Sequence, residues 1–364
     1  MPEKKPLLAL TMGDAAGVGP EVIARAWAEL ALWELARPFV IGQVKVMERA
    51  LGLTGTQASV EPIANPEEAM PGPSVIPCMD VTGPDLSDLK PGRVDARAGR
   101  AAFEFLVTAI DLALAGRVDA ITTLPLNKES LRAAGIAHPG HTEILGERCG
   151  AADQAMMLYL GPPGVLARGG LGVVHATLHV ALRDVFRLLS RERIERTILF
   201  ADQGMRPFTD GQPPTVAVAG LNPHAGENGL FGDEERTLIA PAVAQAQARG
   251  INVTGPLPAD TLFARARRGE FDAVVAMYHD QGHVALKTLG FDQAVNVTLG
   301  LPIVRTSVAH GTAFDIAWQG HAETRGLIEA VRVAACIVRE RSKHPRDTSC
   351  MPGQAAKRSP NVSD

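Results

Sequence analysis

Three histidines follow short apolar segments of the sequence. LGVVHATLH ends at His179, TVAVAGLNP is followed by His224, and DAVVAMYHD contains His279. Ligand sites in open α/β sheets lie beyond the carboxyl ends of the strands, so parallel neighbouring strands would bring these imidazoles to one rim. Three imidazoles can bind a divalent ion and leave a coordination position for a substrate oxygen. A hydrogen-bonded structural role explains such histidines about equally well, and His175 in the first segment fits that role better.

Two cations stand in otherwise apolar surroundings. Lys287 ends the run HVALK, and Arg305 lies in VNVTLGLPIVRTS, which also contains Asn296. A buried charge without a counter-charge is costly, and an anionic substrate would supply that counter-charge. The alternative is a carboxylate of the protein itself, such as Asp280 or Asp260.

A glycine-rich turn near the N-terminus, in LLALTMGDAAGVGPEVIARAWAEL, could cradle a phosphate. Its glycines, Gly13, Gly17 and Gly19, have the spacing GxxxGxG, which differs from the GxGxxG of dinucleotide-binding loops. Pro20 has no N–H to offer a phosphate, and Asp14 adds a negative charge. A tight turn from a strand into a helix explains this segment at least as well.

The elements that must carry these residues are short apolar runs that alternate with amphipathic stretches. The predicted strands are 38–42, 119–126, 171–179, 215–223 and 272–280. Helical spacing of apolar residues predicts helices over 98–116 and 234–250, the second ending at Gly250. Strands separated by helices indicate an α/β fold with a mainly parallel sheet.

The composition limits the kind of partner. The chain has 364 residues, 46% of them hydrophobic, and a formal net charge of -4. It lacks the basic field that binding to nucleic acid or an anionic membrane would need, so a small-molecule partner is favoured. MPEKKPLLAL carries no signal-peptide pattern, and no window is apolar enough to span a membrane. Four widely spaced cysteines without a CxxC pair indicate reduced thiols and a cytoplasmic protein.

Longer motifs of the sequence resemble those of a known family. The chain is similar to the 4-hydroxythreonine-4-phosphate dehydrogenases of pyridoxal phosphate (vitamin B6) biosynthesis over roughly residues 7–340, in the stretches TMGDAAGVGPE, LPLNKE, PGHTE, HATLHVALRD, GLNPHAGE, PADTLF, MYHDQGHVALK and VNVTLGLPIVRTSVAHGTAFDIA. The resemblance implies that His179, His224 and His279 bind a divalent metal, with one ligand from the partner subunit of a homodimer. It also implies that the phosphorylated substrate is bound by His141, Thr142, Lys287, Asn296 and Arg305.

Two loops resemble those of a more distant family. GDAAGVGPEV and HGTAFDIAWQG are similar to GDGIGPEV and HGSAPDIAGKG of the isopropylmalate dehydrogenases, which hold NAD without a Rossmann fingerprint. This similarity implies that NAD or NADP is bound by Gly17, His310, Gly311, Thr312, Ala313 and Asp315. Three residues differ from those usual in the 4-hydroxythreonine-4-phosphate dehydrogenase family, since Ala15 replaces Pro, Ala309 replaces Asp and Trp318 replaces Gly.

The same similarity implies a two-domain α/β/α architecture with mainly parallel sheets and a cleft between the domains. Residues 1–125 and 295–340 would form the cofactor-side domain. Residues 126–294 would form the domain for metal, substrate and dimerisation. The polar, proline-containing segment 341–364 is expected to be a disordered tail.

The implied reaction is the metal-dependent oxidation of 4-hydroxythreonine 4-phosphate by NAD(P)+ to a 3-oxo acid, which decarboxylates to 3-amino-2-oxopropyl phosphate. Zinc, magnesium, cobalt or manganese would serve as the ion, and Lys287 and Asp280 are candidates for proton transfer. VVHAT before HVALRD, CG followed by AMML, and YHDQGH in place of YHDQGL also resemble a paralogous branch that oxidises D-threonate or D-erythronate 4-phosphate. A metal-dependent hydrolase and a non-enzymatic binding protein are further alternatives.

Overall fold

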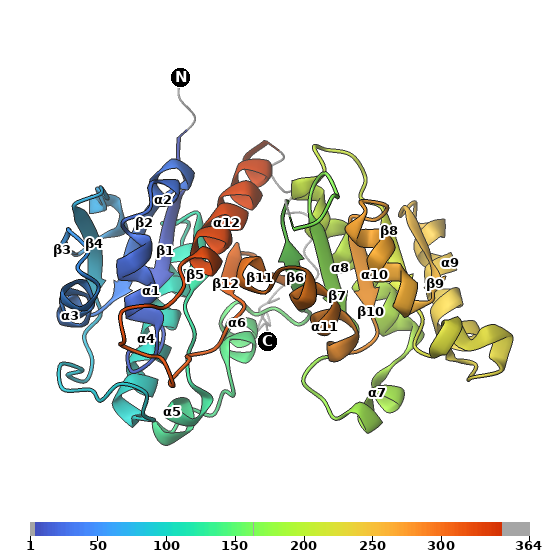
Figure 1. The fold of residues 1–364 in the computed structure, drawn as a ribbon, viewed down its shortest axis with the longest axis horizontal. Helices are drawn as coiled ribbons and strands as arrows, with labels where there is room; N and C mark the ends of the chain where they lie inside the picture. Colours follow the sequence, from blue (N-terminus) through green and yellow to red (C-terminus); the bar gives the residue numbers. More distant parts are fainter. Residues whose placement is uncertain (1–3, 163, 344–364) are drawn as a thin grey trace, which may run out of the picture.

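The computed structural model describes residues 4–162 and 164–343, which form a twelve-stranded sheet covered by helices (Figure 1). The strand order is β3-β4-β2-β1-β5-β12-β11-β6-β7-β10-β8-β9. The strands are β1 Leu7–Thr11, β2 Arg37–Gly42, β3 Ser59–Ile63, β4 Val75–Asp80, β5 Ala120–Thr123, β6 Ala155–Leu160, β7 Leu171–His175, β8 Val216–Ala219, β9 Val253–Leu257, β10 Ala273–Ala276, β11 Val295–Leu299 and β12 Arg305–Val308. The sheet therefore runs without a break from one end of the molecule to the other.

Two parallel halves of this sheet are joined by antiparallel strands at its centre. Strands β3, β4, β2, β1, β5 and β12 are parallel, and so are β7, β10, β8 and β9. Between the halves, β11 pairs antiparallel with both β12 and β6, and β6 pairs antiparallel with β7. The inner strands β5, β7 and β10 are buried at every residue, as expected for parallel strands covered on both faces.

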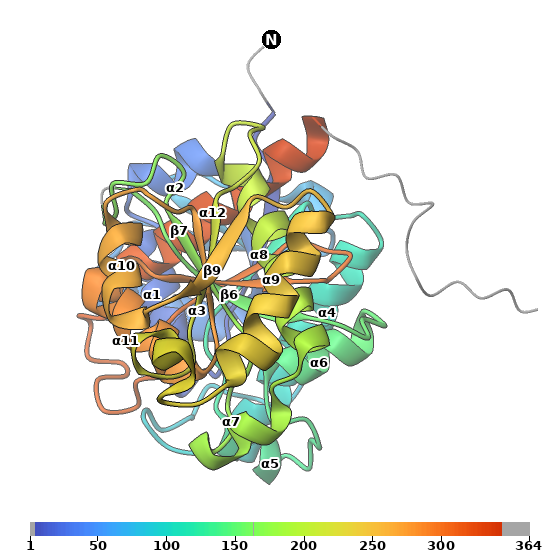
Figure 2. The same ribbon diagram turned by 90° about the vertical axis from the view of Figure 1, so that its right-hand side faces the viewer.

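Helices cover both faces. In the second half, α8 and α9 lie on one side of the sheet and α10 and α11 on the other (Figure 2). In the first half, α4 packs on β1, β2 and β5, and α12 packs on β5 and β12 and contacts α1. The helices are α1 Gly19–Ala26, α2 Leu30–Leu35, α3 Val44–Thr54, α4 Ala96–Leu114, α5 Lys128–Ala133, α6 His141–Arg148, α7 Leu182–Leu188, α8 Arg191–Met205, α9 Ala240–Ala248, α10 Ala259–Arg267, α11 His279–Gly290 and α12 Arg325–Lys343.

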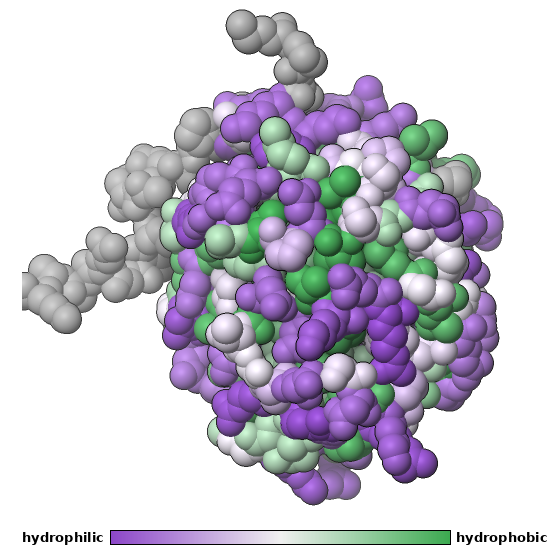
Figure 3. All heavy atoms as spheres, turned by 90° about the vertical axis from the view of Figure 1, so that its left-hand side faces the viewer, coloured by the Kyte–Doolittle hydropathy of each residue, from purple (hydrophilic) through white to green (hydrophobic). Residues whose placement is uncertain are grey.

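The outer edges of the sheet carry residues that discourage further strand pairing. The edge strand β3, SVEPI, is mostly exposed and contains Glu61 and Pro62, and the opposite edge strand, β9, contains Pro256. Charged residues and proline are common ways of protecting a sheet edge. The face at the β3 end is largely hydrophilic, with hydrophobic side chains showing between the polar ones (Figure 3). None of the described helices is long and apolar enough to cross a membrane.

The predicted strands form at the expected places, but several end earlier than predicted. β7 ends at His175, where a strand to residue 179 was predicted, and β10 ends at Ala276, where residue 280 was predicted. His179 has a positive φ of 42°, which a strand cannot continue through, and His279 begins α11. β8 ends at Ala219 instead of residue 223, and β5 at Thr123 instead of residue 126. Three histidines expected at strand ends therefore lie beyond the strands, on a loop, a turn and a helix start.

The predicted helices also form, with one correction at the C-terminus. Helix α4 covers the predicted 98–116 with slightly shifted bounds, and the predicted 234–250 is a π-helical turn, Glu235–Ile239, followed by α9. Gly250 has a φ of 82°, as a glycine after a helix end should. Residues 341–343 belong to α12 and not to a disordered tail, and 344–364 lie outside the described residues. The predicted division into two domains stays a prediction, because the sheet is continuous.

Close packing of α4 on α5 leaves no room for a side chain at Gly99. A Cβ there would lie 2.1 Å from the carbonyl oxygen of Ser130, whereas a Cβ at the exposed Gly52 of α3 would meet nothing within 4 Å. We expect Gly99→Ala to lower the free energy of unfolding by roughly 1–3 kcal/mol through overpacking. Gly52→Ala should raise it by about 0.5–1 kcal/mol, because alanine favours a helix. Urea unfolding followed by circular dichroism measures both, and equal shifts of one sign would contradict the packing.

Candidate active site

Four histidines gather where β7 and β10 end. His175 is the last residue of β7, and His279 and His283 lie one turn apart at the start of α11. The ring centroids of His279 and His283 are 3.8 Å apart, with the rings only 9° from parallel, and the centroids of His179 and His279 are 5.6 Å apart. His175 in turn lies beneath His283, with Nε2 3.1 Å from Nδ1 of His283. The structure thus brings two of the three predicted metal ligands together.

Burial keeps the two inner histidines neutral. Their pKa values are depressed mainly because burial disfavours the charged form, well below the usual range for His175 and to about 4 for His283. Neighbouring imidazoles and Lys287 act in the same direction. Neutral imidazole is the form that binds a metal or accepts a hydrogen bond.

The first half of the sheet contributes charged groups to the same place. The pKa of His179 is lowered by burial first and then by the charges of Lys128 and His279, while Glu143 opposes the shift. Lys128 begins α5, and Glu143 lies in the first turn of α6. A Cβ at Gly140 would lie 3.5 Å from Glu143 Oε2 and 3.8 Å from Lys128 Cε, so these groups are close neighbours. The two halves therefore meet at the histidines.

His224 lies on a separate, left-handed turn after β8. The residues His224, Ala225, Gly226, Glu227 and Asn228 all have positive φ. Left-handed backbone costs roughly 1–2 kcal/mol for each non-glycine residue, and such strain is concentrated at functional sites. The ring of His224 is exposed and lies 6.4 Å from that of Phe231.

A buried carboxylate holds the start of this turn. Glu235 Oε1 accepts hydrogen bonds from the backbone N–H groups of Leu221 and Asn222, both at 2.7 Å, and its Oε2 accepts one from Asn222 Nδ2 at 3.0 Å. A Cβ at Gly226 would lie 2.7 Å from the same carboxylate. Glu235 thus positions His224, although the sequence analysis missed it, because an acidic residue in the first turn of a helix is common.

Residues after β10 tie the two strand ends together. Gln281 accepts a hydrogen bond from the backbone N–H of Met277 at 2.7 Å and donates one to the carbonyl of Gly220 at 2.7 Å. Asp280 Oδ1 lies 2.6 Å from Nδ1 of His279. A carboxylate on one ring nitrogen fixes the orientation of an imidazole and leaves Nε2 available for a ligand.

The centre of the sheet holds a buried cation without a carboxylate partner. Arg305 is 5% exposed, and its guanidinium donates to the hydroxyl groups of Thr298 at 2.9 Å and Thr123 at 2.7 Å. No described carboxylate lies within ion-pair distance, and Arg305 Nε has no partner among the described residues. Burial lowers the pKa of Arg305 to about 10, so it is still charged at neutral pH. The predicted protein partners, Asp280 and Asp260, are therefore not its counter-charges.

His141, at the start of α6, lies beside this cation. Its pKa is held well below the usual range, first by burial and then by the charge of Arg305. On β11, next to β12, Asn296 donates to the carbonyl of Val308 at 3.4 Å, and its buried Oδ1 has no partner among the described residues. The unpaired Nε–H of the buried Arg305, beside a neutral ring, suits an anionic ligand, and the free Oδ1 of Asn296 suits a hydrogen-bond donor. Thr142, the next predicted binding residue, is exposed.

Lys287 lies apart from the metal-binding candidates. It is eight residues beyond His279, about 12 Å along the axis of α11. Its Nζ donates to the carbonyl of Ala309 at 3.3 Å and lies 5.3 Å from the ring centroid of Phe291. It has no ion pair among the described residues, so the proposed partner Asp280 does not neutralise it. Lys287 therefore lies at the base of the loop that follows β12.

That loop, with the predicted cofactor residues His310 to Asp315, packs directly on the N-terminal glycine turn. Val18 N donates to the carbonyl of Thr312 at 3.0 Å, and a Cβ at Gly17 would lie 2.9 Å from the same oxygen. The indole of Trp318 donates to the carbonyl of Ala15 at 2.9 Å, and the guanidinium of Arg49 lies 4.2 Å above that indole. Trp318 has a φ of 61°, the conformation in which glycine is usual. Two of the unusual residues, Ala15 and Trp318, thus contact each other.

Comparison with known proteins decides the family. The sequence profile described as "Pyridoxal phosphate biosynthetic protein PdxA" matches residues 34–334. The chain belongs to the PdxA family. It is 47% identical to a putative D-threonate 4-phosphate dehydrogenase of Oceanobacillus iheyensis over 91% of this chain and 97% of that protein. It is 45% identical to a 4-hydroxythreonine-4-phosphate dehydrogenase of Desulfosudis oleivorans over 92% of this chain and 97% of that one.

Solved structures agree with this assignment. The 4-hydroxythreonine-4-phosphate dehydrogenase of Klebsiella pneumoniae matches with a TM-score of 0.81 and 47% identity, over 92% of this chain and 99% of that one. A phosphotransacetylase of Staphylococcus aureus, at 11% identity and a TM-score of 0.52, shares the fold alone. The predicted family and the α/β fold with a mainly parallel sheet are thus confirmed, and the PdxA-family chain is a dehydrogenase.

The predicted ligands fit a divalent ion in part. Two imidazoles bound to one tetrahedral ion at about 2.1 Å have ring centroids roughly 5 Å apart. The 5.6 Å between His179 and His279 is close to that separation. Within residues 4–162 and 164–343, no three His, Cys, Asp or Glu side chains are grouped closely enough to hold a metal ion. Metal binding by His179, His224 and His279 therefore stays a prediction, and it needs a third imidazole to approach the pair.

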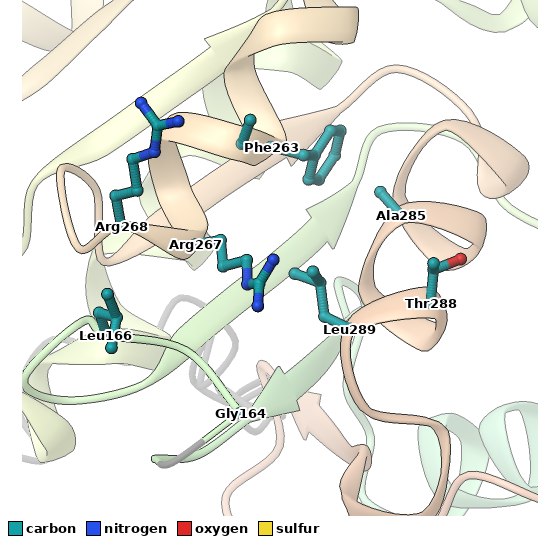
Figure 4. A pocket seen from close by; sticks show the side chains of 9 residues that line it. Gly164, Leu166, Phe263, Arg267, Arg268, Ala285, Thr288 and Leu289 are labelled. Carbon is teal, nitrogen blue, oxygen red and sulfur yellow. The ribbon is translucent and has the colours of Figure 1, made fainter.

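One cavity lies away from all these residues. It has a volume of about 540 Å³ and is lined by α10, α11 and the loop before β7 (Figure 4). In that view Arg267 points toward Leu289, and the ring of Phe263 lies across from Ala285. None of the predicted site residues lines it.

The glycine turn also contains a buried acid that sequence analysis treated only as an unfavourable charge. Asp14 is fully buried, and its Oδ1 accepts from the backbone N–H of Ala16 at 2.9 Å. Burial is the largest cause that raises its pKa from 3.8 to about 6. The folded chain therefore binds a proton more tightly here than the unfolded chain, and stability falls as pH rises from about 4 to 6.

We expect Asp14→Asn to remove this loss. Its free energy of unfolding relative to the unsubstituted protein should increase between pH 4 and pH 7, by roughly 1–3 kcal/mol, because the neutral amide avoids the buried charge. The exposed Asp292→Asn is the matched control and should give a parallel curve. Urea unfolding at several pH values measures the difference. A constant offset for Asp14→Asn would contradict the buried ionisation.

Proposed function

We propose that this PdxA-family chain is a divalent-metal-dependent NAD(P)+ dehydrogenase that oxidises a 4-phosphorylated four-carbon hydroxy acid. The observation that carries the proposal is the buried, unpaired Arg305 beside a neutral His141. A phosphate or carboxylate would supply the missing counter-charge and accept a hydrogen bond from the free Nε–H of Arg305, and a hydroxyl or ammonium of the substrate would donate to the free Oδ1 of Asn296. Substrates named for the relatives carry both groups.

D-Threonate 4-phosphate is the favoured substrate, and 4-hydroxythreonine 4-phosphate is the second candidate. The two acids differ at C2, which bears a hydroxyl in the first and an ammonium in the second. Four relatives at 45–47% identity are named D-threonate 4-phosphate dehydrogenases, two of them as putative, and one at 45% is named for the other substrate. This is the observation that favours the first acid.

The residues of this chain divide the work of such a reaction. Arg305 and His141 would hold the anionic group of the substrate at the centre of the sheet, and Asn296 would accept a hydrogen bond from a hydroxyl or ammonium of the same substrate. His179, His224 and His279 would hold the divalent ion, which when bound lends positive charge to stabilise the developing alkoxide. Asp280 keeps the ring of His279 in one orientation, and neutral imidazoles leave the full charge of the ion available to the substrate.

The nicotinamide cofactor would lie along Gly17 and the loop His310, Gly311, Thr312, Ala313 and Asp315. When bound there, it would supply the acceptor for a hydride from C3 of the substrate. Lys287, whose Nζ lies beside Ala309 at the base of this loop, would take the hydroxyl proton as the neutral amine, which is the only form that can accept one. The 3-oxo acid then loses carbon dioxide as the C1–C2 bond breaks. The electron pair of that bond stays on C2 and forms an enolate with the C3 carbonyl, and C2 is then protonated. D-Threonate 4-phosphate would give dihydroxyacetone phosphate.

A substrate panel tests the proposal. The 4-phosphates of D-threonate, D-erythronate and 4-hydroxythreonine are compared by kcat/KM. Each assay contains NAD+ or NADP+, and the absorbance of the NADH or NADPH that forms gives the rate. We expect the highest value with D-threonate 4-phosphate, because four relatives at 45–47% identity carry that name. We also expect a chelator to abolish turnover. Zinc, magnesium, cobalt or manganese should restore it. Release of inorganic phosphate without nicotinamide reduction would instead support the hydrolase.

Arg305→Gln tests the anion site directly. The KM for the phosphorylated substrate should rise roughly a hundredfold, because a charge-assisted pair is lost, while the melting temperature should not fall, because a buried unpaired cation is removed. Arg117→Gln is the control, since it also removes one arginine. Arg117 is exposed, forms an ion pair with Glu67, and is not one of the predicted site residues. An unchanged KM in Arg305→Gln would exclude Arg305 as the anion-binding residue.

A further inference from the structure

The ring of His279 is held from two directions. Asp280 Oδ1 lies 2.6 Å from its Nδ1, and the ring of His283 lies against its face, with centroids 3.8 Å apart and planes 9° from parallel. His283 is four residues after His279 on α11, the spacing that places two side chains on one helix face. The hydrogen bond to Asp280 alone would let the imidazole of His279 turn about the line from Nδ1 to the carboxylate. The ring of His283, packed against its face, limits that rotation.

His283 is itself fixed by a strand. Its Nδ1 is 3.1 Å from Nε2 of His175, which ends β7 and pairs with Ala276 of β10. The ring of His175 fills the space next to Gly282, where a Cβ would lie 2.3 Å from its Nε2. The first turn of α11 can thus lie on β7 only because residue 282 is glycine. The orientation of His283 is set by the sheet and not by a mobile loop.

We propose that His283 is a positioning residue whose stacked ring holds the imidazole of His279 for metal binding. The proposal rests on the proposed function, because it concerns the same ion. His283 does not share the ion with His279 in this arrangement, since the two ring centroids are 3.8 Å apart, closer than the roughly 5 Å of two imidazoles on one tetrahedral ion. A flat ring at residue 283 is the property that matters, and the hydrogen bond to His175 keeps that ring in place.

The test compares His283→Leu with His283→Phe in the full-length protein stripped of metal. Both variants lose the hydrogen bond to His175, but only phenylalanine keeps a flat ring against His279. Cobalt(II) is titrated by absorbance and calorimetry, because its spectrum reports the donors and geometry of the site. His321→Leu, which removes an exposed histidine bonded only to the carbonyl of Gln319, is the control. Melting temperatures of the stripped proteins are measured alongside.

We expect His283→Leu to bind cobalt 10–100-fold more weakly, the range for residues that support a metal ligand, while the melting temperatures of His283→Leu and His283→Phe fall together, because both variants leave Nε2 of the buried His175 without its partner. His283→Phe should recover most of the affinity, and His321→Leu should match the unsubstituted protein. Equal affinity of His283→Leu and the unsubstituted protein would overturn the positioning role and leave the proposed function standing. Equal weakness of the leucine and phenylalanine variants would also overturn it. If the unsubstituted protein binds no cobalt, the metal dependence in the proposed function fails, and this inference fails with it.

Discussion

The antiparallel pairing of β11 with β12 and β6 is the interaction on which the rest of the structure depends. Without β11 and β12, which come from the C-terminal part of the chain, β5 and β6 would each have an open edge. Unpaired backbone groups at an edge are costly when they are buried. With them, two parallel half-sheets become one sheet of twelve strands. The same pairing sets Thr298 beside Arg305 and Asn296 opposite Ser307. The anion-binding candidates are therefore a direct consequence of how the sheet is closed at its centre.

Several costs of folding are concentrated around this junction. Arg305 and Asp14 are buried charged or ionisable groups without an ion-pair partner among the described residues, and His179 and His224 have left-handed backbone. None of these features improves packing, and each is the kind of local conflict that functional sites retain. Arg305 lies at the centre of the sheet and His179 follows the end of β7, which favours a site where a small anion and a metal act together.

For the histidines, the contacts that place the candidate ligands near each other differ from the contacts that orient their rings. His179 and His279 come within ring-contact distance because β7 and β10 pair in parallel. Their orientation depends on groups that bind nothing themselves, namely Asp280, His283 and His175. His224 depends in the same way on the carboxylate of Glu235, which holds the backbone before the left-handed turn. A sequence comparison that considers only candidate ligands would overlook four of these seven residues.

The sequence by itself determined the family, the α/β class and the types of residue that form the site, because long motifs and the alternation of apolar runs with helical spacing are local properties of the chain. It also placed Gly17 near Thr312, although the contact shows that backbone packing alone already requires a glycine there. Only the tertiary structure decided where the strands end and that Arg305 lacks a carboxylate partner. It also decided that Lys287 lies two turns from His279, and that Glu235 supports His224 and His283 supports His279. These facts depend on contacts between residues far apart in the sequence. They also depend on left-handed backbone at 179 and 224, which residue type alone does not signal, since only a few per cent of non-glycine residues adopt it.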